Sequence, residues 1–151
     1  MPNWCDNKLI VSGDKTELSR FLKEATTDDG EFTFEKIVPR PKELDITCVW
    51  GYRDKATAEQ GLKNIELFGF RDWYEWNIAN YGTKWNVGES NIEDMGGLIE
   101  IEFGTAWSPP IPWVKKVVQL FPELEFVLHY DEPGMSYKGV YSKGTDKCIE
   151  Y

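Results

Sequence analysis

The fold of this chain is decided by the segment Leu98–Thr105, which reads Leu-Ile-Glu-Ile-Glu-Phe-Gly-Thr. Ile99, Ile101 and Phe103 fall on one side of an extended chain and the two glutamates fall on the other, as in a strand with one buried face. The glycine pair just before this segment predicts a turn. Trp85–Ile92 is therefore predicted to be the other strand of a hairpin.

Periodicity and capping residues place two amphipathic helices and further strands outside this hairpin. Asp14, with Glu17 three residues later, is typical of a helix start, and Pro122 stops the second helix. Each helix carries its apolar residues at the spacing of a single face. The predicted elements are a strand at Trp4–Ser12, a helix from Asp14 that ends by Thr26, a helix from Ser108 to Phe121, a strand at Leu124–Asp131, and an edge hairpin of Ser136–Ser142 with Cys148–Tyr151.

A helical insertion is expected between the first helix and the hairpin, over residues 31–80. Glu31–Val38 alternates but leads into prolines, which predicts an extended arm or a short edge strand. Asp54–Asn80 is rich in helix formers, and Gly61 and Gly69 are candidates for dividing it into two helices. The apolar positions expected along it are Leu62, Ile65, Phe68, Trp73 and Trp76.

Without the insertion, the elements follow the order strand, helix, strand, strand, helix, strand. This order predicts a ferredoxin-like (split βαβ) fold of the α+β class, with both helices on one face of an antiparallel sheet. The C-terminal hairpin is expected to extend the sheet at one edge. We expect residues 1–151 to form a single domain, since 151 residues is the size of one typical domain.

Composition and charge argue against several classes of protein, among them nucleic-acid-binding, zinc-binding, disulfide-rich and membrane-spanning proteins. The chain has 26 acidic and 17 basic residues and a net charge of -9, which disfavours direct binding of DNA or RNA because affinity for phosphates comes from Lys and Arg. Three cysteines without a close pair and a single histidine predict neither a disulfide framework nor a zinc site, and no cofactor is expected. The absence of a basic leader and of a long apolar run predicts a cytoplasmic protein without a membrane span.

Four separated motifs resemble one known family. In chain order they are Met1–Leu9, Ile37–Pro41 after a Phe-x-Phe pair, Tyr81–Asn86 and Thr105–Pro110. Over nearly its whole length the chain resembles the YubB-like proteins of bacteriophages and plasmids, with Tyr81 in place of the tryptophan that is usual before Gly-Thr-Lys-Trp. The resemblance implies a ferredoxin-like domain in a phage or plasmid accessory protein of the bacterial host cell, and it supplies no catalytic residues.

The segment Trp73–Asn86 is predicted to join the insertion to the sheet, and five of its fourteen residues are Trp or Tyr. Gly82 ends a helix, and Trp85 is expected to anchor the junction in the core. Lys84 is expected to pair with an acid of the sheet. The alternative is that this turn holds an anion or a carboxylate of a partner.

A shallow pocket for a partner is predicted if the loop at residues 105–110 lies near the first strand. Trp4, Trp85 and Trp107 would then frame it, whereas the alternative is that these rings belong to the core. Ser108 is also placed to cap the second helix. The candidate interaction residues are Asn3, Trp4, Asn7, Lys84, Trp85, Asn86, Trp107 and Ser108.

Catalytic and metal-binding interpretations of the polar residues have less support. Cys5 would need a neighbouring base to act as a nucleophile, and His129 is the only histidine. His129 shares a strand face with Glu125 and Asp131, a pattern more typical of hydrogen-bonded structure than of acid-base catalysis. The densest carboxylate group has no spacing typical of a cation-binding loop. Its members are Glu89, Glu93, Asp94, Glu100 and Glu102.

The sequence therefore favours a non-enzymatic module that binds another protein, and no catalytic residue is assigned. A sharper version is an acidic inhibitor of a host defence protein or of a nucleic-acid-binding protein, which would accept the acidic surface in a basic groove. The alternative is a small nucleotide- or metal-binding enzyme that uses Lys84, His129 and nearby carboxylates.

Overall fold

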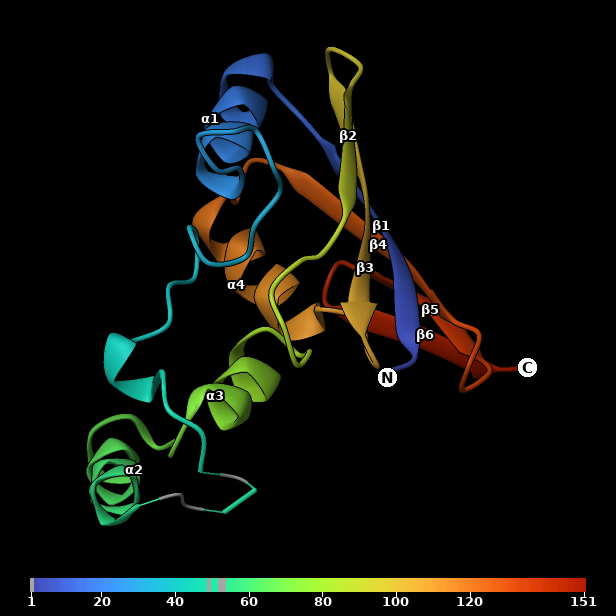
Figure 1. Cartoon of the computed structure of the whole chain (residues 1–151). Coiled ribbons are helices and arrows are strands. Elements are labelled where there is room, and N and C mark those ends of the chain that lie inside the picture. The colour runs from blue at the N-terminus through green and yellow to red at the C-terminus, as the bar shows by residue number, and fades with distance from the viewer. Residues whose placement is uncertain (1, 49, 52–53) are drawn as a thin grey trace.

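A computed structural model describes residues 2–48, 50–51 and 54–151 (Figure 1). Its six strands form one antiparallel sheet in the order β2-β3-β1-β4-β5-β6. The first four strands and the helices between them have the order of the ferredoxin-like fold, so the predicted α+β fold class is confirmed. The strands are β1 Trp4–Ser12, β2 Ser90–Asp94, β3 Leu98–Ala106, β4 Glu125–Glu132, β5 Tyr137–Ser142 and β6 Thr145–Glu150.

The helices form two groups. α1 and α4 lie along one face of the sheet, whereas α2 and α3 lie beyond one end of it, opposite α1 (Figure 1). None of the helices in the described part of the chain is both long and apolar enough to cross a bilayer. The helices are α1 Lys15–Ala25, the 3₁₀ helix η1 Lys42–Leu44, α2 Lys55–Phe68, α3 Trp73–Asn80 and α4 Ile111–Leu120.

The alternation of β1 and β3 places their faces as predicted. Leu9, Ile99 and Ile101 are fully buried beneath the helices, whereas Lys8 and Glu102 lie on the open face. β1 pairs with β3 along its whole length and with β4 along most of it. The sheet therefore has one apolar face and one charged, solvent-facing face.

The insertion differs from the prediction in its strand and in its glycines. Within the described residues, Glu31–Val38 forms no strand and makes a single bridge, between Thr26 and Phe32. α2 continues through Gly61 and ends at Gly69, which has a φ of 82° and caps the helix in the left-handed region. Only one of the two candidate glycines divides the helical segment, because only Gly69 needs that backbone conformation.

The buried side of α2 is not the side that the apolar residues predicted. Leu62 and Ile65 are exposed, and among the five expected apolar positions only Trp76 is buried. Asn64 faces inward instead, and its amide donates to the carbonyl of Glu43 in η1 at 2.8 Å and to that of Arg71, before α3, at 2.9 Å. This buried amide holds α2 together with Phe68 at the end of the helix, which packs against the core.

The core between the sheet and the helices is aromatic, and the 31–38 arm supplies part of it. The ring centroid of Phe34 lies 4.9 Å from Trp113 and 5.4 Å from Tyr81, and Phe32 lies 4.9 Å from Phe103. The indole N–H of Trp113 donates to the carbonyl of Phe34 at 3.2 Å. The arm is therefore a packed core element and not an edge strand.

Candidate functional site

The predicted strand Trp85–Ile92 begins late, at Ser90, because side chains hold the preceding residues in a loop. Asn86 accepts a hydrogen bond from the backbone N–H of Phe34 at 2.9 Å and donates to Thr33 Oγ1 at 3.0 Å. Asn77 donates to the carbonyl of Lys84 at 2.8 Å. The chain on both sides of Trp85 is thus fastened to the arm and to α3, which prevents it from pairing with β3.

The loop that precedes α4 is tied to the same turn. Thr83 donates from its hydroxyl to the carbonyl of Ala106 at 2.8 Å, and Ser108 donates to the carbonyl of Gly82. Pro110 is the N-cap of α4 and provides no side-chain cap, so the prediction that Ser108 caps this helix is wrong. These hydroxyls join two loops and are not free to bind a ligand.

Trp4 and Trp85 lie side by side, with ring centroids 6.1 Å apart, and they are 46% and 39% exposed. The prediction that Trp85 is anchored in the core is therefore wrong. Lys84 lies with its ammonium 4.7 Å from the ring centroid of Trp85 and 5.0 Å from that of Trp50. It makes no ion pair within the described residues, so the predicted pairing with an acid of the sheet is also wrong.

Trp50 extends this surface onto the insertion, because its ring contacts those of Trp73 and Tyr74 at 6.0 and 5.2 Å. Nothing in the local pattern around Trp50 marks it as a site residue. Its position in a loop, remote in sequence from Trp85, makes the contact visible only in the folded chain. We call the resulting patch the tryptophan surface, and its residues are Trp4, Trp50, Trp73, Tyr74, Lys84 and Trp85.

Trp107 does not join this surface, although it is 44% exposed. In the described structure its ring makes no contact with the ring of Trp4 or Trp85, so the predicted frame of three indoles is reduced to two. Its backbone has a φ of 72° and donates to the carbonyl of Asn3 at 2.9 Å.

The asparagines predicted as polar groups of the pocket serve structural roles. Asn7 is 4% exposed, and its amide donates to Thr105 Oγ1 at 2.8 Å and to the carbonyl of Phe103 at 3.3 Å. The side chain of Asn3 lies against Gly134, where an added Cβ would come within 2.7 Å of it. Asn86 is engaged as described above, so the exposed members of the predicted set are the indoles, while Lys84 is half-buried against two of the rings.

Carboxylates lie at both ends of the tryptophan surface. The rim of the open face beside Trp4 is hollowed, and its acidic lining residues are Asp6, Glu89 and Glu102. A second hollow is lined by Trp50 with Asp45 and Asp54. No lysine or arginine lines either hollow among the described residues.

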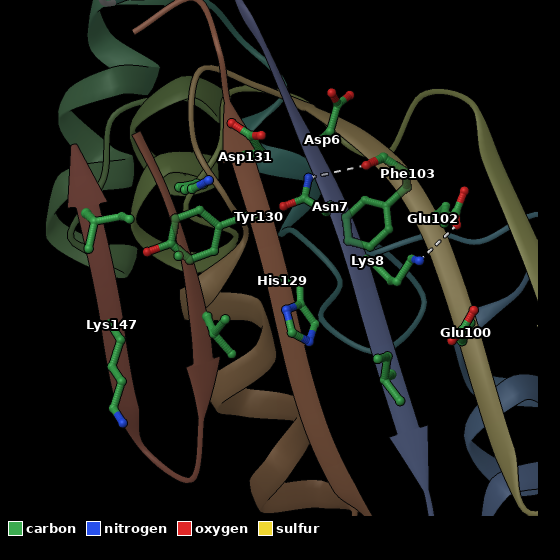
Figure 2. Close-up of a pocket in the computed structure, with 15 residues that line it drawn as sticks. Asp6, Asn7, Lys8, Glu100, Glu102, Phe103, His129, Tyr130, Asp131 and Lys147 are labelled. Atoms are coloured by element: carbon green, nitrogen blue, oxygen red, sulfur yellow. Dashed lines mark hydrogen bonds and ion pairs between the residues drawn. The ribbon is translucent and has the colours of Figure 1, made fainter. Parts of the chain in front are cut away.

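The open face of the sheet carries the residues that an enzymatic interpretation would need. Figure 2 shows His129 between the first strand and the C-terminal hairpin, with Lys8 paired to Glu102 at 3.4 Å on the neighbouring strands. These residues line a hollow on the open face, and Lys84 is not among its lining residues. Among the described residues, no group of three His, Cys, Asp or Glu side chains is placed to hold a metal ion.

Cys5 is a buried thiol on the helix-covered face of the sheet. Burial raises its pKa to about 12, and the nearby carboxylate of Glu132 contributes in the same direction. The thiol is therefore protonated at neutral pH and lacks the thiolate that a nucleophile requires. Its side chain is a small buried part of the core.

We expect the native protein to react rapidly at one thiol with a chromogenic disulfide reagent, and at three in denaturant, because only Cys148 of the three cysteines is exposed. Cys148→Ser should abolish the rapid reaction. A rapid reaction that persists in Cys148→Ser and disappears in Cys5→Ser would show that Cys5 is accessible and reactive after all.

Comparisons with known proteins agree on the fold. Residues 76–149 match the family model described as the ferredoxin-like domain in Api92-like protein. A crystal structure of the protein Api92 from Yersinia pseudotuberculosis superposes with a TM-score of 0.61 at 12% identity, and the match covers 100% of this chain and 98% of that one. No curated protein gives a significant match. The phage or plasmid setting is not addressed by these comparisons and stays a prediction. The chain thus has the same ferredoxin-like fold as Api92, and its residues 76–149 match the domain of the Api92-like family.

Proposed function

We propose that this protein is a non-enzymatic module that binds another protein through the tryptophan surface. The observation that carries the proposal is the exposure of Trp4 and Trp85 side by side and of Trp50, which contacts the same Lys84 ammonium as Trp85; each of the three is between 39% and 61% exposed. Exposed aromatic side chains that cluster on a protein surface often mark an interaction site, whereas exposed apolar residues scattered singly need no such explanation. Tryptophan is also the residue type most enriched among those that dominate binding energy.

The loop that carries Trp85 is held rigidly, which favours binding. The residues before and after it are fixed by hydrogen bonds from Asn77 and Asn86, so the indole is exposed without a mobile backbone. A rigid aromatic side chain loses little conformational entropy when a partner covers it. The surface is therefore pre-organised for docking.

The setting that we propose is that of a phage or plasmid accessory protein in the bacterial cytoplasm. Its sharper form is an acidic inhibitor of a host defence protein or of a nucleic-acid-binding protein. The net charge of -9 supports this form, because such a partner has a basic groove that attracts an acidic surface.

The alternative of a small nucleotide- or metal-binding enzyme requires Lys84, His129 and carboxylates to converge. Lys84 lies on the tryptophan surface, whereas His129 lines the open face of the sheet. The geometry of the described residues thus favours the binding module.

In a pull-down from bacterial lysate, we expect the wild-type chain to retain a partner that Trp85→Ala and Trp4→Ala lose by about tenfold or more, because truncating a hot-spot aromatic costs about 2 kcal/mol or more of binding energy. Trp107→Ala is the matched control, since Trp107 is similarly exposed but lies outside the tryptophan surface. Recovery that is equal for all three variants, or no recovery above background, would refute the proposal.

A further inference from the structure

The tryptophan surface already holds a cation. The ammonium of Lys84 lies over the rings of Trp85 and Trp50, and within the described residues it has no carboxylate partner. A cation over an indole is attracted by the negative face of the ring. Because the carbonyl of Lys84 is fixed by Asn77, its flexible side chain can leave the rings without disturbing the loop.

Some of the carboxylates beside these rings form no ion pair with a lysine or arginine of the described chain. In the hollow next to Trp4, Glu102 forms an ion pair with Lys8. Asp6 and Glu89 are exposed and have no ion pair among the described residues. In the hollow next to Trp50, Asp45 pairs with Arg40 and Asp54 caps α2. The excess negative charge is therefore greatest beside Trp4.

Resting on the proposed function, we propose that the segment docking here is an arginine-rich stretch of a partner protein, and that one of its guanidinium groups takes the place of the Lys84 ammonium over Trp50 and Trp85. A second cationic group then enters the hollow beside Trp4, where Asp6 and Glu89 receive it. Arginine fits better than lysine, because a planar guanidinium stacks on an indole and also forms a bidentate contact with a carboxylate.

Gly104 keeps the hollow beside Trp4 open. It lies near the end of β3, paired with Asp6 of β1, and an added Cβ would be 3.7 Å from Trp4 Cε3, an ordinary contact. No strained φ requires glycine at this position. Gly104→Leu therefore fills the hollow while leaving the strand intact.

The inference is tested by fluorescence anisotropy with labelled oligoarginine, oligolysine of equal length and an uncharged Gly-Ser peptide. We expect oligoarginine to bind most tightly, oligolysine more weakly and the uncharged peptide not at all, with affinity falling as salt rises. Trp85→Ala and Gly104→Leu should each weaken oligoarginine binding about tenfold, which is the loss of about 1.4 kcal/mol. Circular dichroism of each variant verifies that it is folded.

The most specific expectation concerns Lys84→Met, which should bind oligoarginine about threefold to tenfold more tightly because the internal competitor is gone. Lys15→Met removes the same charge at the start of α1, which lies at the opposite end of the molecule from α2 (Figure 1). At physiological salt this remote charge is screened beyond about 8 Å, so its removal should change affinity less than about twofold. If Lys84→Met and Lys15→Met change the affinity for oligoarginine equally, the proposal that a guanidinium displaces the Lys84 ammonium is overturned.

The experiment separates this inference from the proposed function. Equal binding of oligoarginine by wild type, Trp85→Ala and Gly104→Leu, or no binding, would overturn the cationic-segment inference. If a lysate partner still depends on Trp85 and oligoarginine fails to displace it, the tryptophan surface is a docking site for a different segment. If wild type and Trp85→Ala instead recover the lysate partner equally, the proposed function itself is refuted.

Discussion

Gly82→Ala is expected to lower the free energy of unfolding by about 2–5 kcal/mol, from strain and overpacking together. Gly82 has a φ of 86°, where a residue with a Cβ pays a conformational cost. The added Cβ would also lie 2.4 Å from Pro112 Cδ and 3.2 Å from the carbonyl oxygen of Pro109. Neither the proline ring nor the backbone can move aside without shifting the start of α4.

Two other glycines separate these contributions. Gly69 has a φ of 82° with nothing within 4 Å of an added Cβ, so Gly69→Ala should cost only about 1–2 kcal/mol of backbone strain. Gly88 has neither a positive φ nor a close neighbour, and Gly88→Ala should change stability by less than about 1 kcal/mol. Urea denaturation of the three variants measures the differences. If Gly82→Ala costs no more stability than Gly69→Ala, the start of α4 shifts to accommodate the added Cβ at little cost.

Trp113→Ala is expected to cost about 3–5 kcal/mol, the range for truncating a buried aromatic. Its indole is fully buried against Phe32 and Phe34, and it supplies the N–H that satisfies the carbonyl of Phe34. The loss is a large fraction of the about 5–15 kcal/mol that stabilises an ordinary domain. The 31–38 arm should loosen first, because this ring holds it to α4.

Thermal and urea denaturation measure the effect, and hydrogen exchange of the arm locates it. Trp113→Phe keeps most of the packing but loses the bond to the Phe34 carbonyl, so it should cost less than Trp113→Ala. Trp85→Ala removes an indole that is 39% exposed, so it should cost less than Trp113→Ala, whose ring is fully buried. If Trp85→Ala proved as destabilising as Trp113→Ala, the tryptophan surface would be a part of the core.

The elements predicted with most success are those whose packing follows a local period. β1 has the bounds that alternation predicts, and Asp14 caps α1 through a hydrogen bond from the N–H of Thr16. β2 was predicted too long because contacts made by Asn86 with the arm, more than fifty residues away, stop the strand. Such contacts leave no periodic trace in the sequence.

The candidate site also has a part that the sequence predicts and a part that it does not. Of the three indoles in the conditional sequence prediction, Trp4 and Trp85 do lie together, whereas Trp107 does not join them. The exposure of Trp85, the contact of Lys84 with two indoles and the participation of Trp50 were not predictable from the local pattern.

The ferredoxin-like order of elements, the buried face of the sheet and the acidic charge follow from the sequence, because period, capping and composition can be read from the chain without its folded structure. Which aromatic rings are buried and which are exposed depends instead on the packing of the folded chain. The reason is that an indole is buried or exposed according to the segments packed around it. Here those segments are the arm, which packs against the buried Trp113, and the loop of Trp50, whose exposed ring lies 5.0 Å from the Lys84 ammonium.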